Sequence, residues 1–227
     1  MQTKITLHRK ALKRLPFYDY LRNLRQPYSQ KRQLEEWKRN GEPVPPPHLI
    51  KQQMIKDCAK RHNLQVFVET GTYYGDMVEA VMDTFSTIYS IELSAQLADK
   101  AKRRFRKTEK VEIIQGNSKT VLEDLVSKLN RPTFFWLDGH FAGGETARGD
   151  EDTPIFGELM QIFKTPPPRY VVYIDDARCF GSKDYPSYPR IEALLDFIAK
   201  ARNGLDIEVA YDSVRIVPKV MRFENSR

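Results

Sequence analysis

From residue 65 onwards, short apolar segments alternate with amphipathic ones, and this alternation constrains the fold more than any other feature of the chain. Five apolar segments have the length of buried strands: 65–69, 87–92, 111–116, 133–138 and 170–175. Segments with helical periodicity stand between them, and two further strands over 205–212 and 213–219 form an apparent hairpin. Strands that alternate with helices predict a Rossmann-like, doubly wound α/β fold, with a mostly parallel seven-stranded sheet and helices on both faces.

The first 62 residues differ from the rest in both charge and pattern. They hold 15 Lys/Arg against 5 Asp/Glu, a balance of +10, whereas the remainder carries −3. Residues 18–41 and 48–63 have helical patterns, and the proline-rich segment 42–49 between them cannot be helical. We therefore expect a basic helical N-terminal extension with a Pro-rich connector over 1–62, and a Rossmann-like domain over 63–227.

The composition also bears on location. No apolar run approaches the roughly 20 residues of a membrane-spanning helix, and residues 1–15 lack the continuous apolar stretch of a secretory signal. Cys58 and Cys179 lie far apart, with neither metal-type nor disulfide-type spacing. A cytoplasmic protein is expected, although two thiols fit a reducing compartment without proving it. The basic extension leaves contact with an anionic membrane or a nucleic acid open, or a helical arm packed on the domain.

Acids or other polar groups stand where each of the five strands ends. In an open α/β sheet, ligands bind beyond the carboxyl ends of the strands. One acid in such a place is usually a helix cap or a turn residue, but a set of five in register favours a binding site. The set comprises Glu69, Glu92, Asn117-Ser118, Asp138 and Asp175-Asp176.

The turn after the first strand, "ETGTYYG", differs from the dinucleotide-binding fingerprint. Gly71 and Gly75 are four positions apart, with two tyrosines between them and an acid before them. This spacing ranks a nicotinamide-dependent oxidoreductase last, because the fingerprint needs closely spaced glycines against a pyrophosphate. An acid before the turn suits a ligand with an amine or a sulfonium. Glu92 is well placed to accept both hydroxyls of a ribose, or else it is a carboxylate that leads into a helix.

Four segments together, "FVETGTYYGD", "YSIELS", "IIQGNS" and "FFWLDG", resemble the strand-end motifs of class I S-adenosylmethionine (SAM)-dependent methyltransferases. The resemblance covers about residues 64–218. It departs from the family pattern at Tyr73, where a middle glycine often stands. The resemblance implies SAM as cofactor, with Glu69 and Gly71 beside the methionine moiety, Glu92 on the ribose and Asn117-Ser118 flanking the adenine. The expected cofactor-binding residues are Glu69, Gly71, Thr72, Tyr73, Gly75, Glu92, Asn117, Ser118 and Asp138.

Three acids at the ends of the fourth and fifth strands predict a cation. Asp138, Asp175 and Asp176 would repel one another in a small volume unless protons or a cation compensate. Oxygen ligands suit Mg²⁺ or a similar hard divalent ion. The arrangement resembles metal-dependent small-molecule and sugar O-methyltransferases, including the macrocin type. Alternatively, Asp176 caps a turn and Asp138 merely neighbours the cofactor.

The chemistry expected from these residues is methylation of a hydroxyl on a sugar, a glycoconjugate or another small molecule. Asp138 or His140 would take the hydroxyl proton, although His140 could equally orient the substrate or bind metal. Substrate contacts are expected from His140, Arg148, Arg178 and Tyr185. The glycine-rich segment 141–152 has the composition of a lid or of a surface loop.

Two alternatives of other classes stay open. One is a nucleic-acid methyltransferase, acting on RNA, whose basic extension holds the substrate. No N-P-P-Y-like stretch for an exocyclic amine and no catalytic-cysteine context support it. The other is a non-enzymatic scaffold with the basic extension as an anchor. Homo-oligomerisation is also left open by the sequence.

Overall fold

The structure is a computed structural model that describes residues 31–138, 154–186 and 188–223. The chain divides into two compact units, Met1–Ile50 and Lys51–Arg227. In the described part of the first unit, residues 31–39 form a helix, which ends where Gly41 and Glu42 adopt positive φ. There Glu42 N donates to Trp37 O at 3.0 Å, and the Trp37 indole donates to Pro43 O at 2.7 Å.

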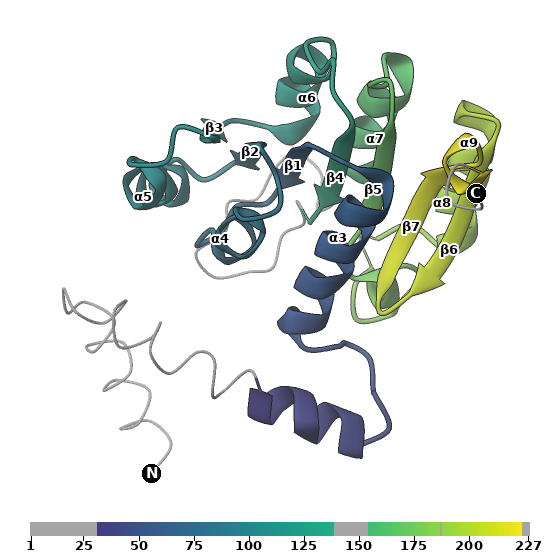
Figure 1. Cartoon of the computed structure of the whole chain (residues 1–227). Coiled ribbons are helices and arrows are strands. Elements are labelled where there is room, and N and C mark those ends of the chain that lie inside the picture. The colour runs from purple at the N-terminus through teal and green to yellow at the C-terminus, as the bar shows by residue number, and fades with distance from the viewer. Residues whose placement is uncertain (1–30, 139–153, 187, 224–227) are drawn as a thin grey trace. The chain divides into compact units, whose positions relative to one another are not determined.

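The second unit is built on one seven-stranded sheet of order β3-β2-β1-β4-β5-β7-β6 (Figure 1). The first five strands are parallel, and β7 is antiparallel to both β5 and β6. The strands are β1 Val66–Thr70, β2 Thr87–Glu92, β3 Val111–Gln115, β4 Thr133–Leu137, β5 Tyr170–Ile174, β6 Leu205–Ala210 and β7 Ser213–Pro218. The predicted Rossmann-like, doubly wound sheet is therefore confirmed.

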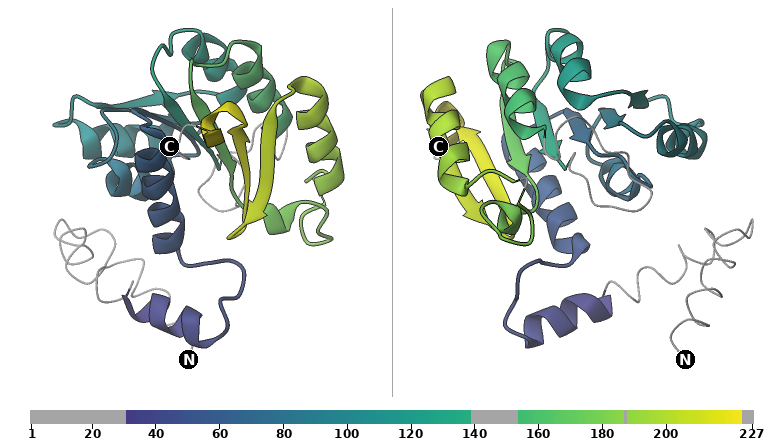
Figure 2. Two further views of the ribbon diagram at one scale, coloured as in Figure 1. Left: turned by 45° about the vertical axis from the view of Figure 1, so that its right-hand side comes forward. Right: turned by 180° about the vertical axis from the view of Figure 1, so that it is seen from behind.

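Helices cover both faces of the sheet (Figures 1 and 2). One face is packed by α6 Ser118–Val126, α7 Ile155–Lys164 and α8 Ile191–Ala201, and the other by α3 His48–His62 (from Lys51 on), α4 Asp76–Val81 and α5 Ala95–Phe105. A short 3-10 helix, η1 Ala177–Cys179, follows β5, and α9 Val220–Phe223 follows β7. Most of α3 belongs to the second unit, because its Ile55, Cys58 and Ala59 are buried in that core. The domain boundary predicted at residue 62 stays a prediction.

Alternation along the central strands supplies both cores. Val66 and Val68 of β1 enter one hydrophobic cluster, and Phe67 between them enters the other. In the same way Phe135 of β4 faces α6, α7 and α8, while Phe134 faces α3, α4 and α5. Because both faces are covered, β1, β4 and β5 are buried along their whole length. This explains why these strands read as continuous apolar runs in the sequence.

The last two strands form the predicted hairpin, with one correction to its boundary. Residues 211–212, which the sequence pattern assigned to the end of a strand, form the two-residue turn after Ala210. Both have positive φ, 48° at Tyr211 and 63° at Asp212, as a tight turn that matches the strand twist requires. Since β7 runs antiparallel to β5, this turn lies at the end of the sheet where the parallel strands terminate.

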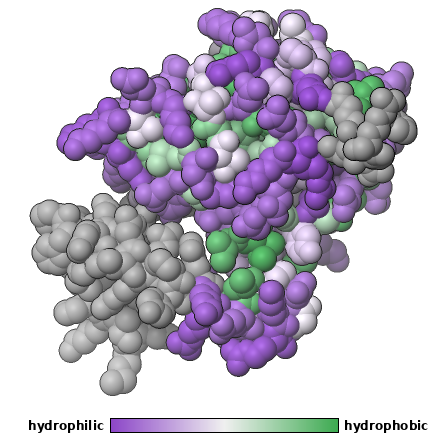
Figure 3. Space-filling model, viewed as in Figure 1, coloured by the Kyte–Doolittle hydropathy of each residue, from purple (hydrophilic) through white to green (hydrophobic). Residues whose placement is uncertain are grey.

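The surface visible in Figure 3 is mostly hydrophilic over the second unit. The large exposed hydrophobic side chains described for the second unit, such as Met160 on α7 and Val209 on β6, come from separate elements. Among the described residues, no helix has the length and apolar composition needed to cross a membrane.

The aromatic packing under β1 generates a stability prediction. Phe67 is fully buried, with its ring centroid 5.2 Å from Phe85 and 6.0 Å from Phe134. Phe67→Ala should lower the free energy of unfolding by about 3–5 kcal/mol, because it removes buried area and leaves a cavity. Met160→Ala, at an exposed position, should change it by less than about 0.5 kcal/mol. Urea denaturation measures both, and equal effects would contradict this description of the core.

Candidate functional site

The carboxyl ends of the parallel strands form one continuous edge. The residue after a strand donates its backbone N–H to the neighbouring strand: Gly71 to Ile91 O at 2.9 Å, Asp138 to Thr70 O at 3.1 Å and Asp175 to Leu137 O at 3.0 Å. Each bond extends a ladder by one residue beyond the strand. The backbones of Gly71, Asp138 and Asp175 are thus fixed side by side at this edge.

Glu69 is a buried acid at the end of β1. Its side chain is 2% exposed and accepts a hydrogen bond from Ser90 Oγ of β2 at 2.5 Å. Ser90 Oγ lies 2.6 Å from Thr72 Oγ1, so Thr72 donates to Ser90 while Ser90 donates to Glu69. This chain of hydroxyls ties the first residues of the glycine turn to the neighbouring strand.

The turn itself keeps the shape of a glycine-rich turn without the middle glycine. Tyr73, which stands where that glycine is usual, has φ 50°, and its side chain is 49% exposed. Gly75 has φ 79°, and a Cβ there would lie 2.6 Å from a ring carbon of Phe105. The Arg104 guanidinium donates to Tyr74 O and to Asp76 Oδ1, which fastens the turn to α5. Tyr73 thus adopts a positive φ at the position where the family pattern often has a glycine.

Glu92, the last residue of β2, has both carboxylate oxygens fixed by backbone donors. Tyr73 N donates to Oε2 at 2.8 Å, and Ser94 N donates to Oε1 at 2.9 Å. The Glu92 side chain is buried, and the hydrogen bond from Tyr73 N links the end of β2 to the glycine turn that follows β1. Each oxygen retains a second lone pair, so the carboxylate can still accept from two vicinal hydroxyls.

Asn117 follows β3 and caps α6, because its side-chain oxygen accepts from Lys119 N at 3.0 Å. Ser118 is the first residue of that helix. The structure thus gives Asn117 a capping role at the start of α6. The expected place of Asn117 and Ser118 beside the adenine of SAM stays a prediction.

Three predicted site acids act on one another electrostatically. Burial raises the pKa of Glu69 well above its usual range; the hydrogen bond from Ser90 opposes this, and the negative charges of Asp138 and Glu92 add to it. Asp138 is therefore close enough to the β1–β2 pair to act on it. A cationic group bound here would lower the pKa of Glu69 again and would be stabilised by its carboxylate.

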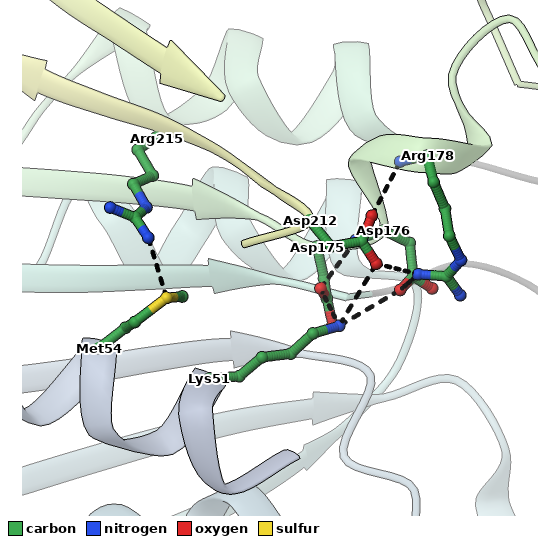
Figure 4. Close-up of polar contacts among 7 residues, drawn as sticks. All are labelled: Lys51, Met54, Asp175, Asp176, Arg178, Asp212 and Arg215. Atoms are coloured by element: carbon green, nitrogen blue, oxygen red, sulfur yellow. Dashed lines mark hydrogen bonds and ion pairs between the residues drawn. The ribbon is translucent and has the colours of Figure 1, made fainter. Parts of the chain in front are cut away.

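A second group of acids gathers at the end of β5. Oxygens of Asp175, Asp176 and Asp212 lie within 4.8 Å of one another (Figure 4). Sequence reasoning found Asp175 and Asp176 but assigned Asp138 as the third member of this group. Asp212 was missed because it was read as strand. The sequence shows an apparent hairpin over 205–219 whose turn carries Asp212, but only the antiparallel pairing of β7 with β5 in the structure brings that turn to the end of β5.

Two cationic side chains already bind this acidic cluster, which we define as Asp175, Asp176 and Asp212. Lys51 Nζ of α3 lies 2.5 Å from Asp175 Oδ1, 3.4 Å from Asp176 Oδ1 and 4.0 Å from Asp212 Oδ2. The Arg178 guanidinium lies 2.6 Å from Asp176 Oδ1 and also binds Asp212 Oδ2. Lys51 was missed because its helix was assigned to the N-terminal extension.

The charge of Lys51 is maintained by its surroundings. Burial by itself would lower the pKa of this lysine, but the charge and hydrogen bond of Asp175, and the charges of Asp176 and Asp138, raise it above its usual range. Lys51 is therefore protonated at any ordinary pH. Its ion pairs within the described residues are with the acidic cluster, at the end of β5 and in the β6–β7 turn.

As arranged, the acidic cluster does not fit a divalent ion. Magnesium and calcium bind carboxylate oxygens at about 2.0–2.6 Å. The Lys51 ammonium, 2.5 Å from Asp175, already fills such a position, and Arg178 binds two more of the oxygens. The metal site predicted at Asp138, Asp175 and Asp176 thus stays a prediction that requires Lys51 to withdraw.

The predicted substrate residues are placed only in part. His140, Arg148 and the expected lid over 141–152 lie outside the described residues. Arg178 is committed to Asp176 and Asp212. Tyr185 is exposed, and its ring packs edge-on against Tyr188, with centroids 6.0 Å apart.

The fold of the chain is similar to that of solved structures of SAM-dependent methyltransferases. Solved structures of this class match most of the chain. SAH-bound methyltransferase PaMTH1 from Podospora anserina has a TM-score of 0.56 at 17% identity, covering 90% of this chain and 97% of that one.

Two O-methyltransferases match similarly. The O-methyltransferase from Bacillus cereus in complex with SAH has a TM-score of 0.57 at 16% identity, covering 88% of this chain and 96% of its own. TomG from Streptomyces achromogenes, involved in tomaymycin synthesis and solved with SAM, has a TM-score of 0.56 at 15% identity, covering 83% and 88%. No family model and no curated protein matches the chain. At such identities the likeness establishes the fold.

The buried Glu69 predicts a pH dependence of stability. Its pKa is raised in the folded chain, so above the ordinary value of 4.5 the unfolded chain loses this proton while the folded chain keeps it. Stability due to Glu69 therefore falls as pH rises from 4.5 towards the folded pKa, by at most about 1.4 kcal/mol per pH unit. Glu69→Gln should lack this decline and be the more stable form at neutral pH.

Urea denaturation of the parent and Glu69→Gln from pH 4 to pH 8 measures the difference. Other titrating groups affect both proteins alike, so only the gap between the two curves reports on Glu69. A gap that stays constant across this range would show that Glu69 has no raised pKa.

Proposed function

We propose that the protein is a SAM-dependent methyltransferase that methylates a hydroxyl oxygen of a small molecule, such as a sugar or glycoconjugate. The observation that carries the proposal is the shared edge of the sheet. There the linked acids Glu69 and Glu92 adjoin Asp138, whose charge acts on Glu69 and on Lys51. One side of this edge suits a donor with positive charge and a ribose, and the other suits a polar acceptor.

The donor side fits SAM in its chemistry. Glu92 presents a carboxylate, fixed by Tyr73 N and Ser94 N, that can accept both ribose hydroxyls. Glu69 is a desolvated acid whose ionised form gains stability from a nearby cation, such as the amine or sulfonium of the donor. Thr70 Oγ1, at the end of the same strand, is buried with no hydrogen-bond partner within the described part of the chain. These groups would border the methionine and ribose parts of the cofactor.

When bound, SAM supplies an activated methyl group, so that attack by a hydroxyl oxygen forms a C–O bond, breaks the C–S bond and leaves its electron pair on sulfur. The chain then has to orient the hydroxyl and accept its proton. Asp138 is the described residue proposed for the proton, which would pass from the acceptor oxygen to a carboxylate oxygen. His140 is proposed as an alternative acceptor of that proton.

A polar, ring-shaped acceptor is supported by the segment after β5. Three aromatic side chains lie there. The rings of Phe180 and Tyr188 pack edge-on with their centroids 5.2 Å apart, and the exposed Tyr185 ring packs edge-on against Tyr188. Phe180 and Tyr188 are buried and support the exposed ring of Tyr185, and an exposed aromatic ring near a charged network suits a sugar or another polyol. Tyr185 and Arg148 are accordingly proposed as acceptor contacts. Arg178 is proposed to act on the acceptor side through its ion pairs.

Transfer of a labelled methyl group from SAM tests the activity. The parent chain is incubated with sugars, glycoconjugates and phenols in one set, and with RNA in another. Label in a base-stable methyl ether of a small acceptor supports the proposal. Label confined to RNA would contradict the acceptor class, and absence of SAM binding would contradict the activity itself.

Cofactor binding depends on Glu92 in this account. Glu92→Gln should weaken binding of S-adenosylhomocysteine (SAH) about tenfold or more, because a charge-assisted acceptor of the ribose hydroxyls is lost. Asp99→Asn, at an exposed position of α5, is the matched control and should bind like the parent. Isothermal titration calorimetry measures all three, and unchanged affinity in Glu92→Gln would remove the ribose assignment.

Asp138 should matter for transfer more than for binding. Asp138→Asn removes the proposed proton acceptor but keeps the size of the side chain. The rate of methyl transfer should fall by about 10²–10⁴-fold, while the SAH dissociation constant changes little. A parallel loss of binding and transfer would instead place Asp138 in the cofactor site alone.

A further inference from the structure

Lys51 is the residue at the sheet edge whose role the proposed function leaves unexplained. Its side chain is 6% exposed, although lysine is seldom buried in proteins. Its ammonium contacts Asp175 and Asp176 at the end of β5 and approaches Asp212 in the β6–β7 turn. Figure 4 shows Lys51 reaching the three carboxylates from α3, with Arg178 approaching from the 3-10 helix.

The helix that carries Lys51 is anchored in the core. Ile55, Cys58 and Ala59 lie on the same side of α3 as Lys51, because they follow it by four, seven and eight positions, and all three are buried. Met54, one turn further along α3, accepts a hydrogen bond at its Sδ from Arg215 Nη2 of β7 at 2.9 Å. The ammonium is therefore held in place by packing along the helix.

The acidic cluster needs this positive charge. Asp175 and Asp212 are buried, and like charges in such a site are unfavourable unless compensated. Arg178 compensates part of this charge by binding Asp176 Oδ1 and Asp212 Oδ2, and its backbone N–H donates to Asp212 Oδ1 at 2.9 Å. Lys51 compensates the rest through its ion pairs with Asp175 and Asp176.

We propose that the Lys51 ammonium is a built-in cation of the acidic cluster, which takes the position that a divalent metal would otherwise occupy. The ammonium and a metal ion cannot share that position, because both are cations and the ammonium already lies 2.5 Å from Asp175 Oδ1 and within 4.0 Å of oxygens of Asp176 and Asp212. It follows, if the proposed function holds, that methyl transfer by this chain proceeds without a metal. Lys51 is a positioning residue that holds the aspartates beside the acceptor.

The proposal predicts that removal of the lysine creates a metal site. Lys51→Met keeps an unbranched side chain of similar length and removes the ammonium together with its hydrogen bonds to Asp175 and Asp176. Its acidic cluster should then bind Mn²⁺, which favours the same oxygen ligands as Mg²⁺. Mn²⁺ is titrated into the full chain, and the free ion is followed by electron paramagnetic resonance. The affinity of Lys51→Met should exceed that of the parent by about 100-fold, the fold-change expected if a favourable site replaces one already occupied by a cation.

Two further variants locate the effect. Lys56→Ala removes another lysine of α3, one that is half-buried and paired with the exposed Asp83 away from the acidic cluster, and should bind Mn²⁺ as weakly as the parent. Lys51→Met combined with Asp175→Asn should lose the site again, because the carboxylate of residue 175 becomes a neutral carboxamide. Lys51→Arg, which keeps the charge, should also fail to bind.

Tight Mn²⁺ binding by the parent chain would overturn the proposal, since it would show that Lys51 gives way to metal. A folded Lys51→Met that binds no better than the parent would overturn it as well. If Lys51→Met does not fold, the titration of the parent alone tests the proposal: weak Mn²⁺ binding supports it, and tight binding overturns it. None of these readouts depends on methyl transfer, so they stand even if the proposed activity fails.

Discussion

The alignment of the parallel strand ends is the constraint on which the site depends. Because β2, β1, β4 and β5 are neighbours in register, their last residues lie in one row, and the backbone bonds of Gly71, Asp138 and Asp175 extend that row by one position. Side chains from separate parts of the sequence are thereby fixed at the same edge. A site made in this way needs rigid strands more than any one loop, and β1, β4 and β5 are fully buried.

Charge then divides this edge into two halves. On the β1–β2 side, the described hydrogen-bond donors to Glu69 and Glu92 are hydroxyl and backbone N–H groups, so Glu92 is available to a ribose and Glu69 can ionise when a cationic ligand binds. On the β5–β7 side, the aspartates are compensated by Lys51 and Arg178. Asp138 stands between the halves. Acidic residues thus line a proposed ligand site on the β1–β2 side and form an internal ion network on the β5–β7 side.

The sequence predicted the sheet, its two helical layers and the strand-end acids, because strand–helix alternation and the position of an acid after an apolar run are local patterns. Lys51 could not be found in the same way. Its partner Asp175 is 124 positions away, and proline-rich 42–49 suggested that everything before residue 63 stands apart. Asp212 depended on the direction of β7, which strand patterns do not give. The backbone conformation of Tyr73 also had to be observed, since tyrosine rarely adopts positive φ.

A crystal structure of the full chain grown with SAH and Mn²⁺, with diffraction recorded at the manganese absorption edge, tests this division of the edge most directly. The account predicts density for SAH against Glu92 and the glycine turn, and no anomalous peak among Asp175, Asp176 and Asp212, where Lys51 remains. An anomalous peak there with Lys51 displaced, or SAH bound away from Glu92, would contradict it.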